Sequence, residues 1–129
     1  MSKAKALVEI ETYDRLAAAI TGATVYQDAP ENATGDLVII GDMKSSSLAT
    51  KGNDADRAVT VSIISLAKAD ERAPLLALQE QIEDALDGQT FTRDGWTLGF
   101  AFEDDDAVLA EDGSTYSGIT TFRVLALAP

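Results

Sequence analysis

The chain has 129 residues, with 22 acids against 10 bases, a formal charge of −12, no histidine and no cysteine. A domain of this length can bury a sizeable core without disulfides. The lack of His and Cys removes the commonest general base, thiolate nucleophiles and Cys-based zinc sites, and the negative charge disfavours binding to a phosphate backbone. An enzyme is therefore the least favoured class, and we expect no cofactor and no bound metal.

The first predicted element is a helix over residues 10–21, in which Ile10, Tyr13, Leu16 and Ile20 recur at helical spacing. Acidic residues interrupt the apolar positions of this N-terminal region. A signal peptide or a membrane span needs an unbroken apolar run. We therefore expect no membrane partner and a chain that remains in the cytoplasm.

Two strands and a long polar loop are predicted next. A short strand covers 23–26, and the β-branched run LVIIGDM over 37–43 has the length and composition of a buried strand. The segment KSSSLATKGNDAD, residues 44–56, shows no periodicity and is rich in Ser, Gly, Asn and Asp. A loop of this length inside a compact domain is usually functional or becomes ordered on a partner.

A strand and the strongest helix follow. The run RAVTVSIISLA over 57–67 alternates as a strand does, and residues 69–87 place Leu75, Leu78, Ile82 and Leu86 on one helix face. Asp70 is the expected N-cap of this helix, and Gly88 is expected to end it. Glu80, Glu83, Asp84 and Asp87 fall on the solvent side of the same helix.

The last third of the chain predicts strands. A short strand over 90–92 leads through the turn 93–95 into an alternating strand that starts at Trp96, a core residue, and the final strand covers 114–127. Arg57 and Arg123 lie on strands and could pair with acids across an interface or on the same sheet, and an ordinary surface ion pair is the simplest expectation. The order α-β-β-β-α-β-β-β predicts one α+β domain over 1–129, with a mostly antiparallel sheet and two helices.

The stretch FEDDDAVLAEDGSTYSG, residues 102–118, places acids at the tip between the last two long strands. It lacks the spacing of an EF-hand calcium loop, although loose metal binding by its carboxylates remains an alternative. Carboxylate catalysis needs burial to raise a pKa, which consecutive acids on a polar tip do not have. A solvated loop and a loop that faces a partner both remain open.

Taken in order, several segments resemble the tail terminator (tail-completion) family of long-tailed bacteriophages and phage-like gene transfer agents. These segments are the N-terminal helix leading to VYQDAP, then LVIIGDM, RAVTVSIIS, LLALQEQIEDALDG and DGSTYSGITTFRVLAL. The resemblance extends from Glu11 to Leu127 and depends on order and spacing rather than on a single motif.

The resemblance implies a structural virion protein that forms a ring, usually of six copies, at the head-proximal end of the tail tube. Such a ring stops tube polymerisation, offers a docking surface to head-completion or connector proteins, and lets DNA pass through its bore without specific binding. Its location would be the host cytoplasm during assembly and the neck of the finished particle.

The polar segments are the expected contact regions of that ring with its own copies, the tube protein and the connector. They contain Lys44, Ser45, Ser46, Ser47, Leu48, Lys51, Asn53, Asp54, Asp56, Asp104, Asp105, Asp106, Glu111 and Asp112. Acids of the second helix are expected to face the bore, namely Glu80, Glu83, Asp84 and Asp87. The alternatives are an acidic protein that mimics DNA and another neck component, such as a stopper or connector.

Overall fold

The computed structural model describes residues 2–28, 35–48, 55–110 and 113–129. Within these ranges the chain forms two helices and seven strands. In chain order they are α1 (Ala4–Ala19), β1 (Thr24–Tyr26), β2 (Leu37–Ser47), β3 (Arg57–Lys68), α2 (Ala73–Leu86), β4 (Thr90–Arg93), β5 (Trp96–Asp105), β6 (Val108–Leu109) and β7 (Thr115–Leu127). The predicted order is confirmed, with β6 as an additional short strand inside the acidic stretch.

The strands form one sheet in the order β1-β2-β3-β7-β5-β4, with β6 attached to β7. Only β1 and β2 are parallel among the described pairs; the others are antiparallel, and β3 pairs with β7 from Arg57↔Ala126 to Lys68↔Thr115. The predicted mostly antiparallel α+β fold is confirmed. β7 is thus an interior strand, flanked by β3 and β5.

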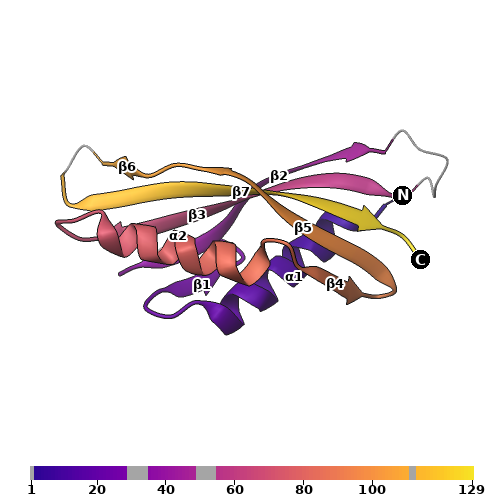
Figure 1. Cartoon of the computed structure of the whole chain (residues 1–129), viewed down its shortest axis with the longest axis horizontal. Coiled ribbons are helices and arrows are strands. Elements are labelled where there is room, and N and C mark those ends of the chain that lie inside the picture. The colour runs from indigo at the N-terminus through magenta and orange to yellow at the C-terminus, as the bar shows by residue number, and fades with distance from the viewer. Residues whose placement is uncertain (1, 29–34, 49–54, 111–112) are drawn as a thin grey trace.

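Both helices lie on the same side of the sheet and leave the other side open (Figure 1). Strand alternation directs Val59, Val61 and Ile63 of β3 toward the helices, where all three are fully buried. On β7, Phe122 is fully buried on the same side and meets Phe100 and Phe102 in edge-to-face ring contacts. The core therefore lies between the helices and one face of the sheet.

Helix α2 buries the predicted stripe but begins later than predicted. Leu75, Leu78, Ile82 and Leu86 are all buried, yet Arg72 rather than Asp70 occupies the N-cap and provides no side-chain cap. The reason lies in Pro74. With Asp70 as N-cap, Pro74 would stand at the fourth helical position, where its backbone nitrogen should donate the first helical hydrogen bond and cannot. In the structure Pro74 stands in the first turn, where no donor is needed.

Helix α1 begins at Ala4, before the predicted start at Ile10, and its buried side differs from the predicted one. Ile10 is 38% exposed, whereas the buried positions are Ala4, Leu7, Val8, Glu11, Thr12 and Leu16. The buried stripe passes through Glu11, and a charged residue in the stripe hides its pattern from a hydrophobicity reading. Neither helix of the described ranges has the length and apolarity that a transmembrane span requires.

Several acids satisfy backbone N–H groups at the ends and irregularities of strands. Asp36 accepts from the amide of Lys68 at 2.9 Å, and Asp56 accepts from that of Ala128 at 2.7 Å. Asp87 accepts from Phe102 at 2.9 Å, beside the point where the pairing of β5 with β7 shifts register. Because unpaired amides are costly, part of the acidic composition serves the sheet itself.

Candidate functional site

The predicted loop 44–56 is in part a strand. Lys44, Ser45, Ser46 and Ser47 continue β2, so their assignment to a loop is wrong. A register shift between Ile40 and Met43 adds one residue to β2 opposite β3. Because side chains alternate along a strand, this bulge turns Lys44 to the open face of the sheet, where it pairs with Thr60. Gly41 inside an apolar strand pattern was the sequence signal for this bulge.

The remaining residues of that predicted loop divide between the described and undescribed parts. Leu48 follows β2, and Asp56 precedes β3 and holds the amide of Ala128. Lys51, Asn53 and Asp54 lie outside the described residues, as do Glu111 and Asp112 of the acidic stretch. Contact roles for these residues remain predictions.

The acidic stretch is also more regular than predicted. Asp104 and Asp105 belong to β5, so they are not at a tip, and a register shift after Phe102 places Asp104 opposite Thr121 and Asp105 opposite Thr120. Asp104 therefore shares the open face with Thr121, while Asp105 points to the helix side. The carboxylate of Asp106 accepts from the amide of Ile119 at 2.9 Å and so extends the pairing with β7.

An acidic groove lies between α2 and the β5–β6 connection. In its floor, buried Gln79 donates to the carbonyl oxygen of Asp106, and a half-exposed apolar side chain, Leu76, stands at its edge. The groove brings acids from two predicted sets together, and its lining consists of Leu76, Gln79, Glu80, Glu83, Asp84, Asp105, Asp106 and Ala107. The fourth acid of the helix set, Asp87, lies outside this lining, at the C-cap.

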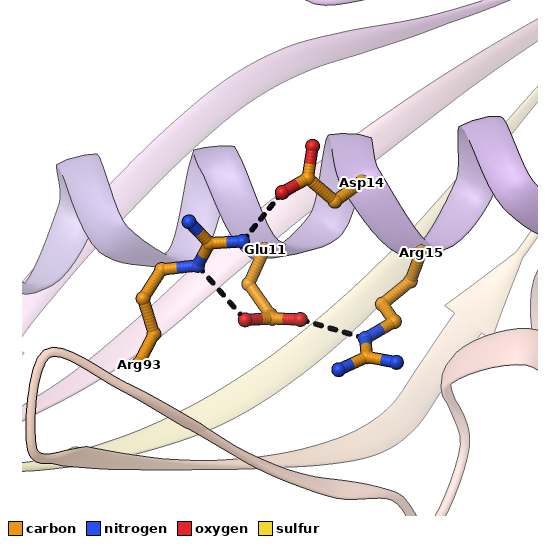
Figure 2. A network of polar contacts seen from close by, with 4 residues as sticks. All are labelled: Glu11, Asp14, Arg15 and Arg93. Carbon is orange, nitrogen blue, oxygen red and sulfur yellow. Dashed lines mark hydrogen bonds and ion pairs between the residues drawn. The ribbon is translucent and has the colours of Figure 1, made fainter.

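The one buried carboxylate of the described chain, Glu11, bridges two arginines (Figure 2). Its two oxygens accept from Arg93 Nε at 2.9 Å and from Arg15 Nε at 2.6 Å, and Arg93 also donates to Asp14. Arg15 stacks over the ring of Phe91, 4.1 Å from its centroid. These contacts attach the β4–β5 hairpin to α1.

Hydrogen bonding to Glu11 is the largest cause that raises the pKa of Arg93 above its ordinary value, with Asp14 adding to it against the lowering effect of burial. Arg93 therefore stays charged, and each carboxylate oxygen of Glu11 accepts a hydrogen bond from one guanidinium group. A carboxylate held in this way stabilises the fold and is not available as a general base. Only the i,i+4 spacing of Glu11 and Arg15 indicated this network in the sequence.

The open side of β7 carries apolar side chains and one arginine. Ile119, Leu125 and Leu127 are 43%, 44% and 40% exposed, and Arg123 stands exposed between them. The expected surface ion pair of Arg123 is wrong for the described residues, because all three ion pairs among them involve Glu11 or Asp14. An interior strand that exposes large apolar side chains is typical of a contact surface.

These surfaces combine exposed apolar side chains with charged ones, a composition suited to contacts with other proteins. Where residues are described, no three acids converge closely enough to hold a metal ion, and Glu80, Asp84, Asp105 and Asp106 of the groove are exposed to solvent. The chemically distinctive features are an open face with exposed apolar side chains, Arg123, Lys44 and Asp104 on one side of the sheet, and an acidic groove on the other.

Comparison with known protein families shows which family the chain belongs to. Residues 11–126 match the family model described as tail completion protein gp17. The chain belongs to this tail completion family. It is therefore a structural tail protein, and the family indicates a non-enzymatic role. The match covers nearly the same range as the resemblance noted in the sequence, which is thereby confirmed.

A solved structure has the same fold. The chain is similar to one from the virion of a native gene transfer agent particle, with a TM-score of 0.81, 21% identity and coverage of 98% of each chain. No curated protein sequence matches this chain significantly. At such low identity the structural match establishes the fold of the tail completion protein and leaves its individual contacts to be derived from its own surfaces.

Proposed function

We propose that copies of this chain close into a ring, six-fold in the simplest case, on the head-proximal end of a tail tube. The ring stops further polymerisation of the tube protein and presents its opposite side to a head-completion or connector protein. The observation that carries this proposal is the match of residues 11–126 to the tail completion family. Similarity to a chain of a gene transfer agent virion supports a place in such a particle.

The chemistry of the surface supports assembly with other copies. One face of the sheet is apolar with exposed cations, and the groove on the helix side is acidic. Two unlike surfaces on one chain favour heterologous contacts, which form a closed ring when the rotation between copies divides a full circle. Such a contact explains how copies could cap a polymer end without becoming a second polymer.

The charge of the chain supports the passage of DNA through the ring. A formal charge of −12 per copy repels phosphate groups, although screening over about 8 Å at physiological salt restricts the effect to residues near the bore. We therefore expect DNA to move through the ring without being held there. The partners of the ring are the tube protein on one side and the connector on the other.

Deletion of the gene tests the proposal directly. Without a terminator, tubes should continue to polymerise, and electron micrographs of particle preparations should show tails of widely varying length. Supplying the chain from a plasmid should restore one length. Normal, uniform tails in the deletion strain would contradict the proposal. Tails of uniform length that are detached from heads would instead identify the chain as a connector or stopper.

Binding measurements distinguish a terminator from a protein that mimics DNA. A protein that mimics DNA should bind a DNA-binding protein as a monomer and should be missing from purified tails. A terminator should be found at the head-proximal end of those tails, where labelled antibodies against the chain would locate it by electron microscopy.

A further inference from the structure

The open face of β7 exposes large apolar side chains that nothing in the described chain covers. Ile119, Leu125 and Leu127 expose 40–44% of their surface on an interior strand, and no helix of the described chain covers them. Arg123 stands among them, and Lys44 lies on the same face, one strand beyond Thr60, which separates the two cations. One acid, Asp104, also lies on this face, opposite Thr121. Neither cation forms an ion pair with a described residue.

The acidic groove has the opposite composition. Leu76, 48% exposed, provides an apolar contact point, and Glu80, Asp84 and Asp105 line the same groove with negative charge. An exposed leucine in this position is unfavourable for the wall of a water-filled bore and suits a protein contact.

The two surfaces also match in spacing. Leu76 and Asp84 are about 12 Å apart along a helix that rises 1.5 Å per residue. Ile119 and Arg123 are about 13 Å apart along a strand that rises about 3.3 Å per residue. An apolar contact at one end and an ion pair at the other can therefore form together.

We propose that the open face of β7 in one copy binds the acidic groove of the next copy, with Ile119 against Leu76 and Arg123 against Asp84. The two surfaces are on opposite sides of the sheet, so one chain cannot join its own pair. The contact is heterologous, as ring closure requires. This inference rests on the proposed ring and assigns Glu80, Glu83 and Asp84 to the contact between copies rather than to the bore.

Cysteine cross-linking tests the pairing, because the chain contains no cysteine and every disulfide must join introduced residues. The variant with both Leu76→Cys and Ile119→Cys, assembled into particles and mildly oxidised, should give a ladder of covalent oligomers that reductant collapses. The matched control pairs Ile119→Cys with Ala17→Cys, an exposed position on α1, and should give no ladder. A ladder equally strong in the control would overturn the pairing.

Dimers formed by Ile119→Cys alone would also overturn it, because they would show two open faces packed against each other. Charge reversal gives a second test. Arg123→Glu should reduce the cross-linked fraction of the double-cysteine variant at least about tenfold, and adding Asp84→Arg should restore most of it. Failure of restoration, with both variants folded, would contradict the ion pair.

The outcomes distinguish this inference from the proposed function. If the double-cysteine variant gives tails of normal length but no ladder, the ring stands and the pairing is wrong. If deletion of the gene leaves tail length unchanged while purified chain still forms the ladder, the pairing stands and the tail-capping role is wrong.

Discussion

Two arginines of the sheet, Arg93 at the end of β4 and Arg123 in the middle of β7, have opposite surroundings. Arg93 donates to Glu11 and Asp14 and holds a hairpin to a helix. Arg123 is exposed among apolar side chains and has no ion-pair partner within the described chain. The contrast indicates which charges serve the fold and which are left for another molecule.

Reversing the charge at Arg123 should have the largest effect on assembly. The variant Arg123→Glu places a negative charge opposite the acids of a neighbouring copy, so we expect loss of the chain from purified tails. Folding stability should change by less than about 0.5 kcal/mol, because the side chain is exposed. Immunoblotting of purified particles measures incorporation, and urea unfolding of the isolated chain measures stability. Normal incorporation of Arg123→Glu would contradict the claim that Arg123 serves a contact with another molecule.

Neutralising Glu11 should have the largest effect on stability. In Glu11→Gln the buried acceptor can no longer balance two guanidinium groups, and we expect a loss of about 2–3 kcal/mol, below the range for a fully buried pair because both arginines are partly solvated. Urea unfolding at neutral pH is the measurement. Glu71→Gln, the same change at an exposed residue, is the control and should cost less than about 0.5 kcal/mol.

The network should not make stability depend on pH through Arg93. Its pKa is raised in the folded chain, so its contribution is complete below the unfolded value and is lost only as pH rises through the still higher folded value, in strongly alkaline solution. The cost of Glu11→Gln measured at pH 7 and at pH 9 should therefore agree.

Gly118→Ala should have an intermediate effect, at the junction that shapes the acidic groove. A Cβ there would stand 2.2 Å from Gln79 Nε2 and 2.5 Å from the carbonyl oxygen of Asp106. The side chain of Gln79 can move, but the backbone of Asp106 must shift, so we expect a loss of about 1–2 kcal/mol. The double variant with Gln79→Ala should remain destabilised. Full recovery in that variant would show that only the glutamine restricts this position.

Arg15→Ala should have the smallest effect. The side chain of Arg15 is 49% exposed, and Glu11 keeps its bond to Arg93 when Arg15 is removed. We expect a loss of about 0.5–1 kcal/mol, from a half-solvated ion pair and the stacking on Phe91. A loss as large as that of Glu11→Gln would show that Arg15, rather than Arg93, balances the buried carboxylate.

Alternation and composition were sufficient for most of the fold. The predicted strands over 57–67 and 114–127 correspond to β3 and β7, and the predicted turn after Arg93 is formed by Asp94 and Gly95, both with positive φ. Such signals are local, because each depends on a residue and its near neighbours in the chain. The start of α2 could also have been predicted from a local signal, because Pro74 is compatible only with the first turn of the helix.

The candidate surfaces were less accessible to sequence reading. Polarity marked Lys44–Ser47 and Asp104–Asp105 as loop, yet these residues are strand, because pairing with β3 and β7 satisfies their backbones. Two bulges then decide which of these side chains face the open side. A bulge depends on how two distant segments register, so composition along one segment gives little indication of it.

The sequence by itself determined the class of fold, the core stripe of α2 and the order of elements, because period and turn chemistry are properties of neighbouring residues. Only the tertiary structure decided that Glu11 is buried between two arginines, that Arg123 has no ion-pair partner within the described chain, and that Asp105 joins the acids of α2. Those outcomes depend on which charged side chains the fold brings close together. These side chains belong to segments that are far apart in the sequence.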